Sequence, residues 1–517
     1  MLTPDQIEAL RLQSEDIIDP VVQFLIGDIA QRISEVGHLT STAAYQVWRL
    51  QHLGVSQRQL KKELRKLLKV SASQLESLLK QSAKAGYNYD IKHLPHANAI
   101  PFEKNADIQR VVEAAVKLAE EDLGSLTQTL GFVAPNGKAM PLTDAYREAC
   151  DFAFKKVFTG AQDYNSAVRE ATKGLVDKGI LRLDYDSGVH RSVEAAVRGS
   201  VMGGLGLLQE QISQQNHDDL GCNGWEISAH ANSAPDHEPI QGKQYPDQEF
   251  QRLNDSLQRR IGTLNCGHSV FPIIMGVHEP QYTPEELEKF REDNEKGITY
   301  NGKHYTMYEA TQRQRLLERK IRKLKRRILV DEKLGDTEQL SIDRTKYVVT
   351  NDEYKRFSKA AGLRIRHERM EMTGFGPKQH GAAENAADSV VRFNEQHMAK
   401  DSAELLPRYD QAVIVDSKLS GYALNPEHPV GKNKAIGFEK VLGYNINNKD
   451  ILIERVRIGL AKYRAKARKP TQYGQPFEVV MLVEGVNGRF APVKTAWQID
   501  AGTDFPRLVS IYVDEKE

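Results

Sequence analysis

Apolar residues in the first 90 positions recur at helical spacing. In "DPVVQFLIGDIAQRISEVG" they return at i, i+3 and i+4, and Gly37 is placed to end the helix. Further amphipathic segments follow up to residue 86, with Ser or Thr near their starts and a break at their ends. The pattern predicts a small helical module at the N-terminus.

Longer helical patterns fill residues 105 to 215. They include "NADIQRVVEAAVKLAEEDLGSLTQTLG" and "LTDAYREACDFAFKKVFTG". The segment "GVHRSVEAAVRGSVMGGLGLLQEQISQQN" differs because small residues crowd it, which lets another backbone approach closely. It is predicted to be a buried packing helix.

The helical pattern stops between residues 220 and 280. Gly, Pro, His, Asn and aromatic residues interrupt any long period there, which indicates turns and short strands. Beyond this segment, Thr283 and Glu286 form a capping-box pair, and "ITYNGKHYT" predicts a hairpin with an Asn-Gly turn. A long helix is then expected over "MYEATQRQRLLERKIRKLKRRILVDEKLG".

The composition changes at Pro407, where a separate unit of about a hundred residues begins. It contains one clear helical pattern, "NKDILIERVRIGLAKYRAKA". Three strand patterns follow it, "FEVVMLVEGV", "RFAPVKTAWQI" and "RLVSIYV", with turn signals between them. The order predicts helices followed by an antiparallel sheet.

These patterns predict an α+β fold: a mostly helical N-terminal body with an irregular His/Cys-containing α/β segment, and a small C-terminal α+β domain with an antiparallel sheet. A chain of 517 residues also exceeds what one core supports. The expected divisions are a helical module at 1–95, a central domain at 96–385, a linker at 386–410 and a C-terminal domain at 411–517.

Composition adds little to this division into domains, but it indicates the cellular compartment that suits the chain. Lys plus Arg is 71 and Asp plus Glu is 70, so the average charge does not indicate a nucleic-acid partner. Three cysteines are too few for a disulfide framework, which suits a reducing cytoplasm. The N-terminus lacks a signal-peptide pattern and "VMGGLGLL" is too short to span a bilayer, so no membrane partner is expected.

The helix expected after residue 306 carries a dense run of basic residues. Such a helix suits a phosphate backbone, where each neutralised phosphate releases counterions. The candidate DNA-contacting residues are Arg315, Arg319, Arg322, Lys323 and Arg326. The alternative is that the basic residues form a solvated face of the helix. The opposite face would then pack against the protein through Leu316, Leu317, Ile321, Leu324 and Ile328. No aromatic residues interleave the run, which argues against stacking on single-stranded bases.

The irregular segment gathers residue types that zinc favours. The candidate ligands are His230, His237, Cys266 and His268, with Cys222 as a fifth. A closed site would clamp two loops that have little core of their own, whereas an open one would leave a position for water and catalysis. The alternative is that these histidines satisfy buried carbonyls and stack on aromatic neighbours, namely Trp225, Tyr245 and Phe271.

"WEISAHANSAPDHEPIQGKQY" followed by "LNCGHSVFPIIMG" resembles the phage minor capsid protein 2 family, a group related to Mu-like head morphogenesis proteins. The resemblance extends over about residues 1 to 380, including "YEATQRQRLLERKIRKLKR". The positions that recur in the family fall on His230, His237, Gln241, Gly242, Asn265, Cys266 and His268. Many relatives carry Arg before the second histidine, where this chain has Pro235 and Asp236.

The resemblance implies a low-copy head protein made with the portal and procapsid. It would act in head assembly and in DNA packaging or ejection, with the portal protein, the major capsid and scaffold proteins and packaged DNA as partners. Its location would be the virion head, after synthesis in the cytoplasm of a host or prophage-bearing bacterium. The central domain would be the minor capsid domain, and the histidine stretch a structural knot tied by zinc.

The C-terminal stretches "DSKLSGYALNPEHPVGKNKAIGFEKVLGY" and "GRFAPVKTAWQIDAGTDFPRLVSIYV" resemble a domain of unknown function over about residues 412 to 515. That domain occurs as the last module of toxin-like proteins and of some phage head proteins. Together with a fold analogy to barnase-like and RelE-like ribonucleases, it implies an alternative function, a nuclease-type effector delivered with the phage genome.

Cleavage of RNA needs an acid, a base and cations for the phosphorane charge. The catalytic candidates in the C-terminal domain are His428, Lys432, Lys434, Lys494, Thr495 and Arg507. The alternative is that His428 only caps a Pro-flanked turn and that the lysines lie on the surface. Whether the chain is an enzyme stays open, and ribonuclease activity is considered for this domain alone.

Overall fold

The computed structural model describes most of the chain. The ranges are 4–37, 72–88, 100–133, 139–159, 167–170, 181–183, 190–192, 208–257 and 267–514, with a few isolated positions between them. Its contacts define two compact units. The first comprises Met1–Gly297, Thr306–Thr337 and Arg366–Phe375, and the second comprises Ile298–Tyr305, Glu338–Ile365 and Gly376–Glu517.

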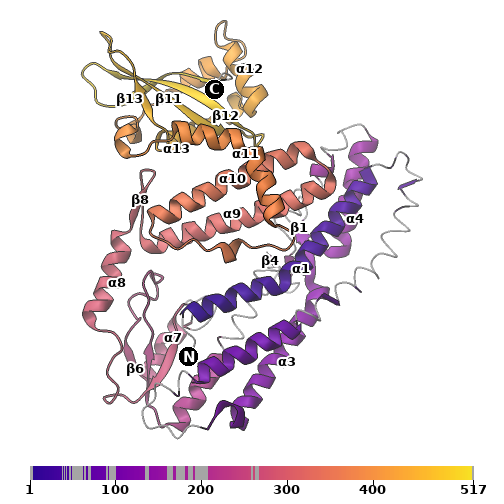
Figure 1. Ribbon diagram of the computed structural model, residues 1–517, viewed down its shortest axis with the longest axis vertical. Helices are drawn as coiled ribbons and strands as arrows, with labels where there is room; N and C mark the ends of the chain where they lie inside the picture. The colour runs from indigo at the N-terminus through magenta and orange to yellow at the C-terminus, as the bar shows by residue number, and fades with distance from the viewer. Residues whose placement is uncertain are drawn as a thin grey trace. The chain divides into compact units, whose positions relative to one another are not determined.

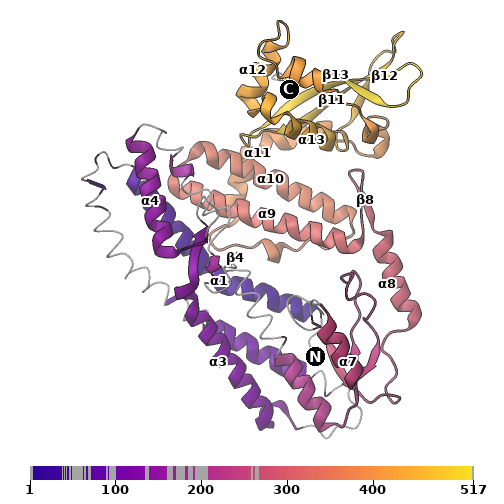
Figure 2. The ribbon, with the colours of Figure 1, turned by 180° about the vertical axis from the view of Figure 1, so that it is seen from behind.

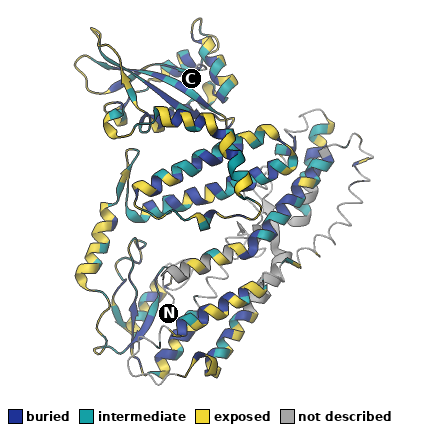
Figure 3. Ribbon diagram, viewed as in Figure 1, coloured by how far each residue is buried: buried dark blue, intermediate teal, exposed yellow. Residues whose placement is uncertain are grey.

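The first unit is organised around helix α1 (Pro4–Gly37), which ends at the glycine that the sequence indicated. One face of α1 is fully buried, at positions spaced three or four apart: Ile18, Val22, Leu25 and Ile29. Helices α4 (Leu142–Phe158) and α9 (Met307–Leu334) contact α1. Figure 3 shows the buried stripe of α1 in dark blue.

A small antiparallel sheet lies where the sequence predicted only helices and loops. It follows α3 (Ala106–Thr129) and has the order β2-β1-β3-β4. Its strands are β1 (Leu130–Val133), β2 (Ala139–Pro141), β3 (Leu181–Leu183) and β4 (His190–Ser192). Strands of three or four residues are too short for a period-two pattern, which explains why they were missed. Strand β4 replaces the start of the predicted packing helix, whose crowded small residues lie outside the described ranges.

The described residues between 220 and 280 form turns and short strands, as predicted, and one helix that was not predicted. The three-stranded sheet β6-β5-β7 is their framework. Its elements are β5 (Gly224–Ile227), β6 (Gln244–Pro246), β7 (Val270–Ile273) and the adjoining helix α7 (Asp247–Ser256). A small apolar cluster supports the far strand, with Phe271 and Ile273 buried and Met275 packed against them. Polar contacts add to the support of this segment.

Two helices begin with the capping boxes that their sequences allow. Helix α8 (Pro284–Lys296) starts after Thr283, whose side chain accepts from the backbone N–H of Glu286. Helix α9 starts in the same way after Thr306 and ends at Gly335 in the left-handed conformation. Both helices confirm the sequence prediction.

The second unit contains the predicted Asn-Gly hairpin. Its first elements are β8 (Ile298–Tyr300), β9 (Lys303–Tyr305), α10 (Thr337–Ala360) and α11 (Pro377–His397). The first residue of α10, Thr337, still belongs to the first unit. The rings of Tyr300 and Tyr305 meet the buried ring of Phe357 edge-on, with centroids 5.2 and 5.6 Å away. These aromatic contacts hold the hairpin against α10.

The C-terminal part of this unit is an antiparallel sheet flanked by helices, as Figures 1 and 2 show. Its elements are α12 (Lys432–Leu442), α13 (Lys449–Leu460), β10 (Ala465–Ala467), β11 (Gly474–Glu484), β12 (Phe490–Asp500) and β13 (Pro506–Val513), in sheet order β10-β11-β12-β13. The helix predicted through residue 467 ends at Leu460, and β10 takes its last residues.

One face of this sheet forms the core with α12 and α13. Alternate residues point into it, and Val479, Val493, Trp497 and Ile511 are buried there. The second face of the sheet carries polar and charged residues such as Glu478, Lys494 and Ser510, together with apolar ones such as Val480. The predicted α+β class, with a mostly helical body and an antiparallel C-terminal sheet, is therefore confirmed.

The predicted domain boundaries differ from the division by contacts, because α10 and the β8–β9 hairpin group with the C-terminal residues. The segment expected as a linker contains the last turns of α11. The four domain ranges given from the sequence concern units that fold independently, and they stay a prediction. Among the described residues, no helix combines the length and apolar character needed to cross a bilayer.

Helix α9 offers a matched test of its packed stripe. Leu317, Ile321, Leu324 and Ile328 are buried as expected, whereas Leu316 is 46% exposed. Ile321→Ala should lower the free energy of unfolding by about 2–5 kcal/mol, because it removes buried apolar volume and leaves a cavity. Leu316→Ala should change it by less than about 0.5 kcal/mol. Denaturant unfolding of the full chain measures both, and equal effects would contradict this packing.

Candidate functional site

Three of the predicted metal ligands meet in the first unit. His230 follows β5, His237 lies in the next loop, and His268 precedes β7, so the pairing of β5 with β7 brings them together. The ring centroid of His268 lies 4.3 Å from that of His230 and 5.2 Å from that of His237. We call these residues with Gln241 and Ser233 the histidine knot. Cys266 lies outside the described residues.

Hydrogen bonds set the proton positions in the histidine knot. The amide oxygen of Gln241 lies 2.9 Å from Nε2 of His268, and an amide oxygen can only accept, so His268 carries its proton on Nε2. Its bare Nδ1 then accepts from Nδ1 of His237, 3.3 Å away. The same Gln241 oxygen accepts from the backbone N–H of His230 at 3.1 Å. One glutamine thus joins two loops.

Burial opposes positive charge on two members of the knot, His268 and His230. Both His237 and His268 are 2% exposed. Desolvation, followed by the neighbouring His230 and His237, lowers the pKa of His268 to about 2. Burial also lowers the pKa of His230. Neutral imidazoles are the form that binds metal.

The knot fits zinc in part. Two nitrogens on one tetrahedral zinc, each about 2.0–2.1 Å from the metal, lie roughly 3.3 Å apart. The His237 and His268 Nδ1 atoms have this separation. Nε2 of His230 is buried without a hydrogen-bond partner and packs against Gly267, the neighbour of Cys266. Within the described ranges, however, no group of three or more ligand side chains converges on one point.

The stacking expected of these histidines involves another residue. His217, which the sequence did not single out, stacks on Trp225 with centroids 4.9 Å apart, and its Nε2 lies 2.9 Å from a carboxylate oxygen of Asp247. His230 instead bonds the carbonyl of Ala231, as the alternative to zinc predicted. No spacing signal marks His217, because its partners lie on separate elements.

Glu226 is a second polar tie that the sequence did not reveal. It lies on β5 and is 1% exposed. Its carboxylate accepts from the backbone N–H of Gln281 and from the side chain of Gln244, both at 2.9 Å. The carboxylate therefore fastens the loop after β7 to the sheet.

Helix α9 presents less of its basic run than the sequence suggested. Of the five candidate DNA-contacting residues, Arg319 is exposed, while Arg315, Arg322 and Lys323 are half-buried and Arg326 is 8% exposed. The last four take part in interactions within the protein. Most of the run therefore serves the packing of the first unit, and Arg319 with its neighbour Lys320 forms the accessible part.

The structure brings two of the catalytic candidates together. The ring of His428 meets Tyr422 edge-on at 4.9 Å, and Nζ of Lys434 lies 4.7 Å from the centre of the same ring. Lys434 also donates to the hydroxyl of Ser510 at 2.6 Å and lies 5.4 Å from the ring centre of Tyr512. We call Tyr422, His428, Lys434, Ser510 and Tyr512 the lysine cluster.

His428 has a capping role in this cluster. Its Nδ1 accepts from the backbone N–H groups of Val430 and Gly431 at 3.1 and 2.9 Å. Because Nδ1 accepts from these two donors, the ring proton lies on Nε2. His428 can therefore donate a hydrogen bond from Nε2 to a ligand. Burial lowers the pKa of Lys434, which suits that residue better to accept a proton.

The other candidates lie elsewhere or are already paired. Thr495 is buried on the core face, where its hydroxyl donates to the carbonyl of Val479 and accepts from the indole of Trp497. Lys494 pairs with Glu478 at 2.9 Å, and Arg507 is bidentate to Asp500. Lys432 is exposed in the first turn of α12.

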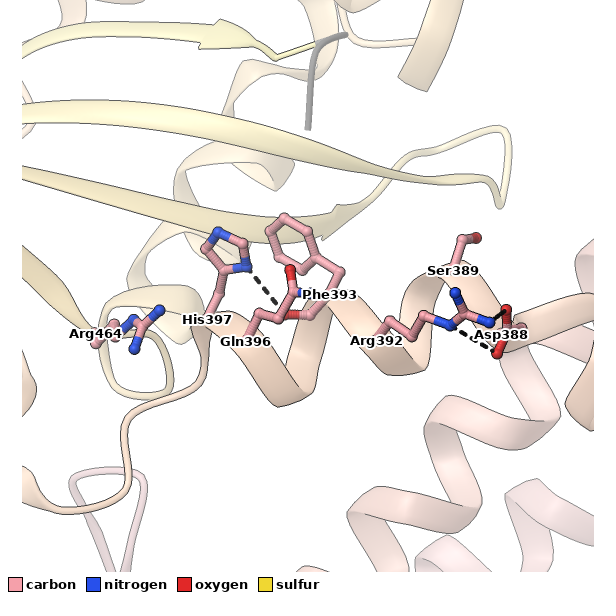
Figure 4. Close-up of a pocket in the computed structure, with 7 residues that line it drawn as sticks. All are labelled: Asp388, Ser389, Arg392, Phe393, Gln396, His397 and Arg464. Carbon is pink, nitrogen blue, oxygen red and sulfur yellow. Dashed lines mark hydrogen bonds and ion pairs between the residues drawn. The ribbon is translucent and has the colours of Figure 1, made fainter.

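A groove of about 690 Å³ runs along α11, as Figure 4 shows. Arg392 turns back to Asp388 on the same helix, and the His397 ring stacks on Phe393 with centroids 4.2 Å apart. Arg464 donates its backbone N–H to the carbonyl of His397 at 3.0 Å. Arg464 thus lies at the C-terminal end of α11, where its positive charge complements the helix dipole. This accounts for Arg464 structurally.

Residues 2–359 match the family model of phage minor capsid protein 2, which is more than half of the 517 residues. The chain belongs to the phage minor capsid protein 2 family. Residues 405–515 match a second model, a domain of unknown function (DUF6883). No curated protein and no solved structure matches the chain.

The two matches divide the sites between them. The minor capsid match contains the histidine knot and helix α9, and the DUF6883 match contains the whole lysine cluster. The resemblance to both families is confirmed. A relationship to Mu-like head proteins and an association with toxins stay predictions.

Structural zinc in the knot also stays a prediction, and metal content tests it. The full chain purified from zinc-supplemented cells should carry close to one zinc ion, because neutral histidines and a neighbouring cysteine supply ligands of the right type. His268→Asn should remove it, whereas His304→Asn, at an exposed position on β9, should not. Absence of metal from the wild-type chain would contradict the prediction.

Proposed function

We propose that this head protein is lodged near the portal in the procapsid and acts in head assembly and in DNA packaging or delivery. The minor capsid family match over residues 2–359 carries the proposal. Its partners would be the portal protein and the major capsid and scaffold proteins. The histidine knot supports a structural role, because its buried side chains are used to fasten loops to one another.

Packaged DNA is the third proposed partner. Arg319 and Lys320 are exposed residues of the basic run in α9, and this contact would rest on them. A contact of two cations neutralises few phosphates, so it would guide DNA weakly and without sequence preference.

A second candidate function is a ribonuclease cargo carried by the C-terminal domain. It is favoured by the lysine cluster, where a lysine with a lowered pKa lies beside a serine and two tyrosine rings. In this function neutral Lys434 would take the proton of a 2′-hydroxyl as the 2′-oxygen attacks the phosphorus. The Lys434 ammonium formed in this way would hold the phosphate and return the proton to the departing 5′-oxygen, and a 2′,3′-cyclic phosphate would form. The two functions are compatible, since one chain can carry both.

Quantitative mass spectrometry of purified full particles tests the first proposal. The chain should be present at a few copies per portal, with peptides from residues 405–517 recovered equally with those from residues 1–400. Portal peptides in the same sample provide the internal standard. Absence from particles would overturn a role in the mature head and leave only a role in assembly. Loss of the C-terminal peptides alone would show that the cargo is cleaved away.

Cleavage of labelled RNA by the full chain tests the second candidate. Lys434→Arg should slow cleavage roughly 100-fold or more, because an arginine keeps the positive charge but cannot act as a base at neutral pH. Lys440→Arg, at an exposed position later in α12, is the matched control and should leave the rate unchanged. A wild-type chain that neither cleaves RNA nor slows bacterial growth would remove this function.

A further inference from the structure

Lys434 differs from the other cations near the polar face of the C-terminal sheet in how its charge is balanced. Lys494 is paired with Glu478, and Arg507 is paired with Asp500. Within the described part of the chain, no carboxylate lies within ion-pair distance of Lys434, and its pKa is lowered by burial alone. Its ammonium group contacts only a hydroxyl and two aromatic rings there.

The surroundings of Lys434 are arranged by regular structure. Ser510 and Tyr512 are two residues apart on β13, so both side chains leave the same face of the sheet. Tyr422 reaches the lysine from a π-helical turn (Leu419–Ala423) that precedes α12. Gly431 packs so closely on the carbonyl of Tyr422 that a side chain there would clash with it. The turn that carries Tyr422 is therefore held against the start of α12.

A structural explanation for Lys434 is a cation–π contact that also buries its aliphatic stem. It explains the two rings but not the choice of a charged residue. Lys434 lies in the first turn of α12, which carries no acidic residue, although the helix dipole favours negative charge at this end. Both the missing counter-charge and the position of the lysine favour an anion from outside the chain.

The hydrogen-bond directions suit a phosphate group. Ser510 accepts from the ammonium through Oγ, so its O–H is not used in that bond and can donate to an oxygen of the ligand. Nε2–H of His428 is a further donor next to Tyr422. Tyr422 and Tyr512 flank the lysine with half-buried rings, which are suitable stacking surfaces for a base attached to the phosphate.

We propose that the lysine cluster binds one nucleotide unit of a single-stranded nucleic acid, with its phosphate on Lys434 and Ser510 and its base against a tyrosine ring. The inference deepens the ribonuclease proposal and rests on it for the choice of nucleic acid as the source of the phosphate. It assigns binding roles to Tyr422, Ser510 and Tyr512, none of which the sequence suggested.

The test measures binding apart from cleavage. The probe is a fluorescein-labelled eight-nucleotide 2′-O-methyl RNA, which lacks the 2′-hydroxyl needed for cleavage, titrated with the full chain by fluorescence anisotropy. Lys434→Met should weaken binding roughly 10-fold to 100-fold through the lost charged hydrogen bond. Tyr422→Ala should weaken it roughly 5-fold or more through lost stacking. Lys434→Arg should retain most of the affinity.

Lys440→Met removes the same charge from the same helix and should leave the affinity unchanged. The melting temperature of Lys434→Met should equal or exceed that of the wild type, because burial already disfavours the charge. A lower melting temperature with unchanged affinity would show a purely structural lysine and overturn the inference. Equal weakening by both methionine variants would overturn it as well, since that outcome indicates unspecific attraction.

Competition identifies the source of the phosphate. Adenosine monophosphate that displaces the probe at micromolar concentration would indicate a free nucleotide, and displacement only by unlabelled oligonucleotide would indicate a strand. If binding depends on Lys434 but the wild-type chain cleaves no RNA, the binding inference stands and the ribonuclease function is overturned. If cleavage depends on Lys434 but Lys434→Met binds the probe with wild-type affinity, the ribonuclease function stands and the binding inference is overturned.

Discussion

A buried polar group must find a partner inside the protein, and this constraint shapes the segment between residues 220 and 280. Its far strand rests on a small apolar cluster, so the loops depend on further contacts to stay in place. Gln241, Glu226 and His268 do so by hydrogen bonds that are shielded from water and strengthened by their surroundings. Loss of any one of them would leave its partners unpaired, which costs more than the bond itself contributes.

The same constraint separates the catalytic candidates of the C-terminal domain. Thr495 has the residue type for chemistry, but both of its hydrogen-bonding functions are used within the core. His428 is likewise engaged by two backbone donors. Lys434 is the exception, because the folded chain desolvates its charge without supplying a carboxylate. A group that the fold leaves unbalanced is better evidence for a ligand than a group that only has a reactive side chain.

Local patterns predicted the elements whose causes are local. The capping box at Thr283, the Asn-Gly hairpin and the three long C-terminal strands all depend on residues close in sequence. The short strands β1 to β4 have only three or four residues each, too few for a period-two pattern, and β1 also pairs with the distant β3. Strand β10 lies in a helical pattern, which its pairing with β11 overrides. The α+β class followed from the local patterns, whereas the division into compact units did not.

Site residues followed the same rule. His230, His237 and His268 were found by residue type, and strand pairing then placed them together. Ser510 and Tyr512 could not be found that way, because serine and tyrosine on a strand carry no signal until the facing helix is known. The basic run of α9 shows the opposite error: the charges were visible, but only the packed helix reveals that Arg326 is buried. Charge in a sequence therefore predicts a binding surface only after packing has decided which charges reach solvent.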